Sequence, residues 1–238
     1  MTVLLVMAKV PAPGAVKTRL CPPATLRQAA RIAAAALLDT LDAVRATPGV
    51  TPVLACAGRL AEGEESAELV EAVARWLVVP QRGTGLAERL VNAHADVAAA
   101  YPGRPVLQIG MDTPQLTPDL LGAALRGLSA ADAVLGQAVD GGWWSLGLRE
   151  PRQAAALRGV RMSTADTGAR TQAALRERGL HVLPAAPLRD VDEWADALAV
   201  AAEAPGGRFA RQVAAVRADL ALRADLAVWA DLAVGSIR

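Results

Sequence analysis

The chain has 238 residues, 53% of them hydrophobic, and its 25 lysines and arginines almost balance its 24 acidic residues for a net charge of +1. This length and hydrophobicity suit one α/β domain with an appendage, and the balanced charge argues against nucleic-acid binding that relies on bulk charge. No apolar run approaches the roughly 20 residues that span a bilayer, so no membrane span is expected.

Two further features concern the location of the protein. Cys21 and Cys56 form no CxxC pair and have no metal-site spacing, which is typical of a reducing compartment. The apolar residues 3–8 lack the preceding basic region and the cleavage site of a signal peptide, and therefore indicate a first strand. We expect a soluble, cytoplasmic protein.

Short apolar runs alternate with longer alanine-rich or amphipathic stretches from residue 2 to residue 204. The apolar runs predict buried strands at residues 2–8, 52–57, 76–80, 105–109, 132–138 and 180–184. The longer stretches predict helices at about residues 25–46, 64–75, 86–100, 118–128, 163–178 and from 190 onward. Capping signals support three helix starts, at Thr25 with Gln28, at Thr117 before Pro118, and at Ser163 with Asp166.

This alternation predicts an α/β fold with a mainly parallel, Rossmann-like sheet and helices on both faces. Residues 205–238 differ in character, because Gly206-Gly207 interrupts the chain and Ala-Asp-Leu then recurs at 218, 224 and 230. A step of six residues is not a heptad. We therefore predict one domain at residues 1–204 and a helical appendage at residues 205–238. The appendage packs either on the domain or on a second subunit, and in the second case the protein is a homodimer.

The segment 103–118 presents a carboxylate at the end of the predicted central strand. The apolar run 105–109 is followed by Gly110-Met111-Asp112, and ligands of open α/β sheets lie outside the carboxyl ends of the strands. Thr117 can cap the next helix, so Asp112 is not needed for capping. Asp112 is thus either a turn residue before Thr-Pro or a metal ligand in a nucleotide site.

The loop that follows the first predicted strand combines restricted backbone with positive charge. Pro11 and Pro13 limit its conformation, and Gly14 allows close approach to a ligand. Lys17 and Arg19 then supply cations near the start of the first helix, where phosphates are commonly bound. The alternative is a set of solvated cations in an exposed loop. Val16 stands where a Walker A loop has glycine, which excludes that motif.

Several other residues have both a structural and a functional interpretation. Asp190 and Asp192 precede a predicted helix, where capping explains only one of them, so Asp192 can meet a metal held by Asp112. Asp140 before Gly141-Gly142 is either a turn residue or a general base. Trp143 and Trp144 point to opposite faces of a strand, so one can be core and the other a platform for a sugar or base. His94 and His181 are interpreted as structural.

Seven short motifs occur in a fixed order across residues 2–204: Lys9-x-Pro-x-Pro-Gly-x-Val-Lys-Thr-Arg-Leu20, Leu86-x-Glu88-Arg89, Ile109-Gly-x-Asp-x-Pro-x-Leu116, Gly136-x-Ala-x-Asp-Gly-Gly142, Leu146-x-Gly-Leu148, Ser163-Thr164 and Asp190-Val-Asp192. Together they resemble the DUF2064 family of GT-A-type glycosyltransferase-like proteins. That family is similar to phospholactate and molybdenum-cofactor guanylyltransferases. In this chain Thr84-Gly85-Leu86-Ala87 replaces the Gly-Asp-Leu-Gly that usually precedes Glu-Arg in the family.

The resemblance implies a nucleotide-diphospho-sugar transferase fold with a Mg²⁺ or Mn²⁺ site. Asp112 then matches the family's metal-binding aspartate, and Asp192 matches a second acidic ligand. The expected catalytic residues are Asp112, Lys17, Arg19 and Asp140. The expected nucleotide- or substrate-binding residues are Lys9, Pro11, Gly14, Lys17, Arg19, Gly83, Glu88, Arg89, Gly141, Gly142, Trp143 and Ser163.

Three functions follow from these residues. The first is metal-dependent transfer of a sugar from a nucleotide-diphospho-sugar to a small-molecule acceptor. The second is nucleotidyl transfer from a nucleoside triphosphate to a phosphorylated small molecule, with release of pyrophosphate. The basic first loop favours the second, because a triphosphate needs more countercharge, whereas the family resemblance favours the first. The third is a nucleotide-binding protein without catalysis.

Overall fold

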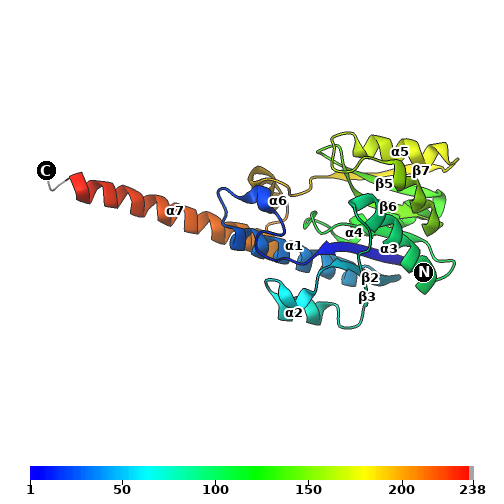
Figure 1. Ribbon diagram of the computed structural model, residues 1–238, viewed down its shortest axis with the longest axis horizontal. Coiled ribbons are helices and arrows are strands. Elements are labelled where there is room, and N and C mark those ends of the chain that lie inside the picture. Colours follow the sequence, from blue (N-terminus) through cyan, green and yellow to red (C-terminus); the bar gives the residue numbers. More distant parts are fainter. Residues whose placement is uncertain (236–238) are drawn as a thin grey trace.

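The computed structural model of the protein describes residues 1–235, with the side chains of all of these except 224 and 227–235. Within this part of the chain the strands form one seven-stranded sheet in the order β3-β2-β1-β4-β6-β5-β7 (Figure 1). The strands are β1 (Thr2–Lys9), β2 (Val50–Ala57), β3 (Leu77–Pro80), β4 (Val106–Ile109), β5 (Ala133–Ala138), β6 (Trp143–Leu148) and β7 (Val182–Leu188).

Strand β6 is antiparallel to its neighbours β4 and β5, whereas the other pairings in the described sheet are parallel. This confirms the predicted α/β fold with a mainly parallel sheet. The carboxyl ends of the parallel strands therefore share one edge of the sheet, and the amino end of β6 lies at the same edge. The loops that carry Lys17, Asp112, Asp140 and Asp192 leave or enter the sheet there.

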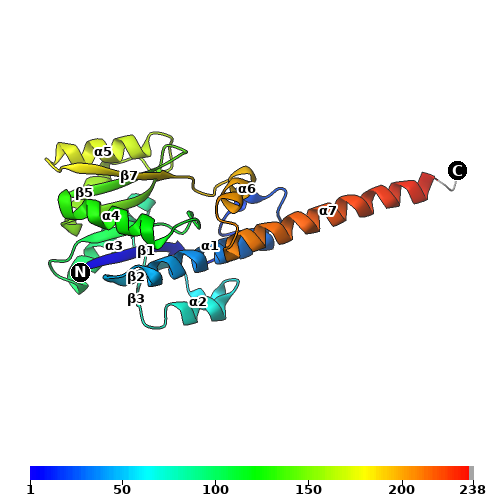
Figure 2. The same ribbon diagram turned by 180° about the vertical axis from the view of Figure 1, so that it is seen from behind.

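Helices cover both faces of the sheet (Figures 1 and 2). They are α1 (Leu26–Ala46), α2 (Ser66–Ala72), α3 (Leu86–Ala100), α4 (Pro118–Ala130), α5 (Thr167–Glu177), α6 (Trp194–Glu203) and α7 (Arg208–Gly235). Buried residues of α1, α2 and α4 pack on one face, and those of α3, α5 and the 3-10 segment Pro151–Gly159 pack on the other. The central strands β1 and β4 are thus covered on both sides, as their near-continuous apolar sequences require, whereas Leu77 and Val78 of the edge strand β3 are exposed.

The predicted caps of α1 and α4 are present. Thr25 and Gln28 form a reciprocal capping box, and the Thr117 hydroxyl accepts from the N–H of Leu120 at 3.3 Å. The predicted start at Ser163 is wrong, because Asp166 is the N-cap of α5 and Ser163 has a left-handed backbone with φ of 58°. Helix α6 begins at Trp194 with Glu193 as its cap, which leaves Asp190 and Asp192 without a capping role.

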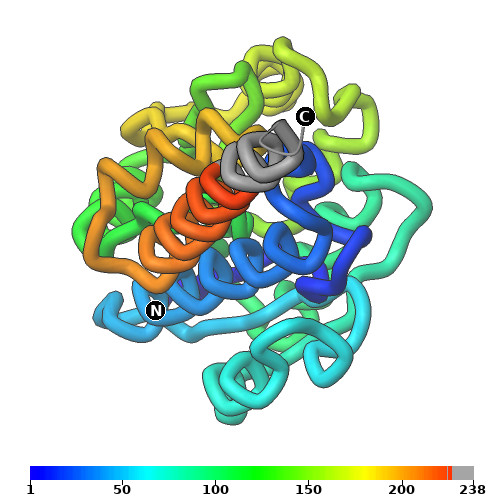
Figure 3. The backbone as a smooth tube through the Cα atoms, turned by 90° about the vertical axis from the view of Figure 1, so that its left-hand side faces the viewer, coloured from blue at the N-terminus to red at the C-terminus, as the bar shows by residue number. Residues whose placement is uncertain are grey.

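The first turns of α7 pack against α1 and α6. Phe209, Val213 and Val216 are buried in a cluster with residues of these two helices, and the Asp39 carboxylate accepts from the backbone N–H groups of Arg208 and Phe209. The rest of α7 extends away from the sheet (Figures 1 and 3). The domain boundary at residue 204 and the homodimer stay predictions, and the side chain of Trp229 lies outside the described residues. No helix within residues 1–235 has both the length and the apolar character needed to cross a bilayer.

Candidate functional site

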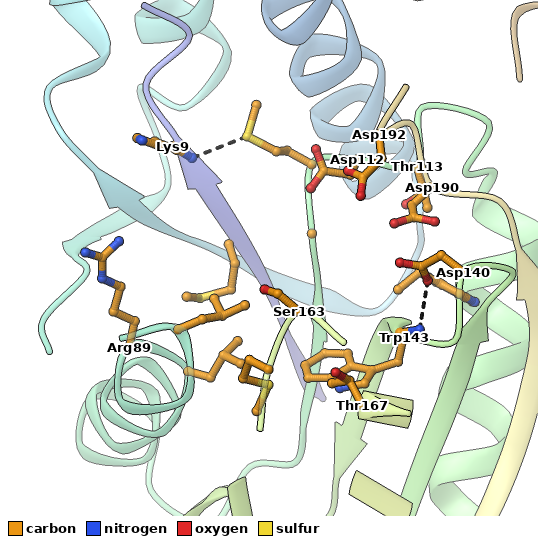
Figure 4. A pocket seen from close by; sticks show the side chains of 18 of the residues that line it. Lys9, Arg89, Asp112, Thr113, Asp140, Trp143, Ser163, Thr167, Asp190 and Asp192 are labelled. Atoms are coloured by element: carbon orange, nitrogen blue, oxygen red, sulfur yellow. Dashed lines mark hydrogen bonds between the residues drawn. The ribbon is translucent and has the colours of Figure 1, made fainter. Parts of the chain in front are cut away.

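A cavity of about 680 Å³ opens at the carboxyl edge of the sheet (Figure 4). Its walls come from the loops after β1, β4, β5 and β7 and from the amino-terminal half of α3. A smaller cavity of about 300 Å³ lies beside it under the loop that follows β1. Most of the residues predicted from the sequence line one or both cavities: Lys9, Lys17, Arg19, Arg89, Asp112, Asp140, Gly142, Trp143, Ser163 and Asp192.

Three carboxylates form an acidic group at one side of the main cavity. Asp140, from the β5–β6 turn, and Asp190 and Asp192, from the segment after β7, each offer an oxygen within 4.8 Å of the others. Burial, together with the charges of Asp140 and Asp192, raises the pKa of Asp190 to about 6. Clustered carboxylates of this kind are the ligands that hard divalent cations prefer. The acidic group therefore has the chemistry to hold Mg²⁺ or Mn²⁺.

Lys17 joins three loops next to this acidic group. Its ammonium contacts the Asp112 carboxylate, lies 3.9 Å from Asp192 Oδ1, and donates to the carbonyl of Val191. The Val191 N–H in turn donates to the Asp112 carbonyl at 2.8 Å. The Lys17 side chain is only 8% exposed, whereas that of Asp112 is 46% exposed. The Lys17 ammonium thus supplies the positive charge that keeps the two predicted metal ligands, Asp112 and Asp192, close to each other.

The other cations of the site are more open to solvent. Arg19 Nη1 donates to Asp192 Oδ2 at 3.2 Å with its side chain exposed, and Lys9 Nζ donates to the Ala15 carbonyl at 2.7 Å. Arg89, at the far side of the cavity in Figure 4, donates from Nε to the Gly83 carbonyl at 3.3 Å. A cation at a solvent-open position with few partners can turn to a phosphate at little cost.

Five of the predicted binding residues do not line either cavity: Pro11, Gly14, Gly83, Glu88 and Gly141. Glu88 accepts from the N–H and the hydroxyl of Thr84, both at 3.0 Å, and these hydrogen bonds lower its pKa. Gly141 has φ of 90°, and a Cβ there would lie 1.9 Å from the Ala165 carbonyl oxygen. The structure thus gives Glu88 a role in holding the turn before α3, and Gly141 a role in close backbone packing.

The two adjacent tryptophans have different environments. Trp144 is buried in the core and donates from Nε1 to the Ala186 carbonyl at 2.9 Å. Trp143 is half-buried and lines the main cavity. Ser163 and Thr167 line the same wall.

The sequence pattern marks Asp190 only as a candidate helix cap and does not single out Gln81 or Gln108, although all three residues line the cavity. Gln108 did carry a signal, as the lone amide in the buried strand Val-Leu-Gln-Ile. Asp190 carried a weaker one, since it stands two residues before Asp192 in a short acidic stretch.

Comparison with known proteins gives a family and a fold. The profile of DUF2064, described as "Uncharacterized protein conserved in bacteria", matches residues 40–164. No curated protein gives a significant match. A crystal structure from Desulfovibrio desulfuricans G20, proposed to be a nucleotide-diphospho-sugar transferase, is 24% identical with a TM-score of 0.78, and the match covers 93% of this chain and 97% of that one.

Two less similar structures share the fold. CMP:2-keto-3-deoxy-manno-octonic acid synthetase complexed with CTP is 12% identical with a TM-score of 0.53, and the match covers 84% of this chain and 97% of that one. The manganese complex of Rv0371c from Mycobacterium tuberculosis H37Rv is 18% identical with a TM-score of 0.50, and the match covers 84% of this chain and 98% of that one.

Proposed function

The chain belongs to the DUF2064 family, and from this premise we propose that it is a metal-dependent glycosyltransferase that uses a nucleotide-diphospho-sugar donor and a small-molecule acceptor. The observation that carries the proposal is the acidic group beside Lys17 and Arg19 at the carboxyl edge of the sheet. At this edge, carboxylates that can bind a divalent cation lie next to positively charged side chains that can bind a diphosphate. The fold shared with nucleotide-using transferases supports the same conclusion.

We assign the metal to Asp190 and Asp192 of the acidic group. We propose Asp112, which lies outside that group and shares the Lys17 ammonium with Asp192, as a further ligand. The manganese complex of a protein with the same fold supports a divalent cation. When bound, Mg²⁺ or Mn²⁺ neutralises the charge that develops on a leaving diphosphate. Arg19 and Lys9 bind the phosphate oxygens from the side of the first loop, because both side chains are open to the cavity.

The remaining steps fall to the acceptor and to Asp140. The acceptor hydroxyl bonds to the anomeric carbon, the bond from that carbon to the diphosphate breaks, and the nucleoside diphosphate leaves. Asp140 takes the hydroxyl proton. One of its oxygens accepts from the Gly142 N–H at 2.7 Å, which fixes the carboxylate at the exposed edge of the cavity.

Nucleotidyl transfer is the second candidate, and the cavity of about 300 Å³ under the first loop favours it. Lys9, Lys17 and Arg19 line that cavity, so there is both room and countercharge for an additional phosphate. In that reaction an acceptor phosphate attacks the α-phosphorus of a nucleoside triphosphate and pyrophosphate leaves. For either reaction we propose a small-molecule acceptor and no nucleic-acid partner.

The test is to incubate the protein with nucleotide sugars and with nucleoside triphosphates, each with and without Mg²⁺ or Mn²⁺, in the presence of a panel of small-molecule acceptors. Release of nucleoside diphosphate supports glycosyl transfer, and release of pyrophosphate supports the second candidate. Metal-dependent nucleotide binding without turnover would leave only a non-catalytic nucleotide-binding protein. Asp192→Asn should abolish the turnover that requires Mg²⁺ or Mn²⁺, and Asp225→Asn on the exposed part of α7 is the matched control.

A further inference from the structure

Two buried polar side chains without hydrogen-bond partners lie beneath the main cavity. Gln108 of β4 is 2% exposed, lines the cavity, and has no partner for its Oε1 among the described residues. His94 of α3 is fully buried, and neither of its ring nitrogens has a partner in the same part of the chain. Buried polar groups are normally paired, because an unpaired one loses its hydration without compensation. These two side chains therefore require an explanation beyond packing.

The strand register shows where the Gln108 side chain points. Gln108 is paired with Leu5 of β1 and Leu146 of β6, and both leucines belong to the core layer that contains Leu90 and Val91 of α3. Gln108 accordingly faces α3, between that helix and the cavity. His94 lies one helical turn beyond Leu90 on the same helix.

His94 is a neutral neighbour of the Gln108 amide. Burial lowers the pKa of His94 to about 4, and the neighbouring Gln108 side chain acts in the opposite direction. The imidazole is therefore uncharged at neutral pH, with one donor and one acceptor nitrogen. An imidazole N–H directed at Gln108 Oε1 leaves the amide NH₂ to meet an acceptor oxygen of a ligand. His94 can thus orient Gln108 without adding charge to the cavity.

The walls around Gln108 suit an uncharged, hydroxyl-bearing ring. Met7, Leu90 and Met162 provide apolar surface, and Trp143 provides an aromatic face. Figure 4 shows Trp143 and Thr167 away from Asp112 and Asp192, with Trp143 next to Asp140. A group joined to a diphosphate at the acidic group can therefore enter this part of the cavity, where its hydroxyls meet Gln108 and its ring lies against Trp143.

We propose that Gln108 is the specificity-determining residue for the sugar of the donor, and that His94 is a positioning residue that orients the Gln108 amide. This rests on the proposed glycosyl transfer, since it assigns the transferred group to that part of the cavity. The amide selects a hydroxyl at one ring position, so sugars that differ in that hydroxyl bind unequally.

The test compares sugar binding with nucleotide binding in the intact protein. Calorimetry with Mn²⁺ is carried out with UDP, GDP, ADP and CDP and with the glucose conjugate of each. Gln108→Met should weaken the best-binding conjugate about three- to tenfold, the range expected for one hydrogen bond. The affinity for the matching free diphosphate should stay within about twofold of wild type. The melting temperature without ligand should stay close to that of wild type, because the variant removes a buried amide and also the acceptor that faces the His94 imidazole.

His94 and a second substitution at Gln108 complete the test. His94→Phe should reduce whatever difference in affinity the wild-type protein shows between the glucose and galactose conjugates of the same nucleotide, and His94→Asn, which keeps a donor, should restore part of that difference. Gln108→Leu serves if Gln108→Met does not fold. Equal weakening of the diphosphate and its conjugate, or a lower melting temperature with unchanged sugar preference, would overturn the proposal while leaving the proposed function in place. If no nucleotide or conjugate binds to the wild-type protein, both proposals fail.

Discussion

Replacing Asp190 by asparagine is expected to stabilise the metal-free protein at alkaline pH. The pKa of Asp190 is raised from 3.8 to about 6, and about 2 pKa units correspond to roughly 3 kcal/mol against the charged form. Solvent and salt screen part of this electrostatic penalty, because the acidic group is partly exposed to solvent. We therefore expect Asp190→Asn to gain about 1–2 kcal/mol in the free energy of unfolding.

The pH dependence has a definite sign. The folded pKa lies above the unfolded one, so the contribution of Asp190 to stability is fully present below pH 3.8 and is lost as the pH rises through about 6. Urea unfolding followed by tryptophan fluorescence should therefore show Asp190→Asn above wild type at pH 8. The two proteins should have equal stability near pH 4.

Bound metal should reverse the order of stability of the wild-type and Asp190→Asn proteins. At a Mn²⁺ concentration of about 100 times its Kd, the wild-type protein should gain about 2.7 kcal/mol at pH 8. Asp190→Asn should gain much less, because it lacks one carboxylate of the site. Asp225→Asn should behave as wild type with and without metal. An Asp190→Asn protein that is less stable than wild type in the absence of metal at pH 8, or that gains as much stability from Mn²⁺, would contradict the metal site proposed at Asp190.

Three further outcomes are expected. Lys17→Ala should lower the free energy of unfolding by about 1–3 kcal/mol, because it leaves Asp112 and Asp192 without their shared cation. Arg19→Ala should lower it by less than about 1 kcal/mol and should weaken nucleotide binding. Urea unfolding measures the loss of stability, and calorimetry measures the nucleotide affinity. Gly141→Ala should cost about 2–4 kcal/mol through backbone clash and strain, with Gly159→Ala, whose Cβ has open space, as the neutral control in the same unfolding assay. A chain ending at residue 220 should melt near the full-length temperature, and one ending at 204 well below it, since Phe209 and Val213 are core residues.

The sequence predicted the parts of the fold that depend on local pattern. Strand and helix periodicity, the caps at Thr25 and Thr117, and the edge at which the motif-bearing loops meet all follow from residues close together in the chain. The start of α5 did not follow, because Ser163 and Asp166 have the spacing of a capping box, and backbone geometry decides which of them caps.

The site was less predictable, because its contacts join distant segments. The sequence pattern predicts that Lys17 binds phosphate, and only the folded chain shows that Lys17 is buried beside Asp112 and Asp192. Glu88 and Gly141 belong to family motifs, yet their described contacts are with Thr84 and Ala165. A motif marks residues that are used together, and it does not tell a ligand contact from a contact that shapes the loop.

The direction of β6 explains how metal and sugar contacts come to share one cavity. Because β6 is antiparallel to β4 and β5, the turn between β5 and β6 lies at the edge where the parallel strands end. Asp140 in that turn joins Asp190 and Asp192 from the segment after β7, and Trp143 at the start of β6 faces the cavity beside Gln108. A parallel β6 would start at the opposite edge and carry Trp143 away from the acidic group. The reversal of β6 thus places Asp140 and the wall for an uncharged ring next to Asp190 and Asp192, which are proposed to hold the metal.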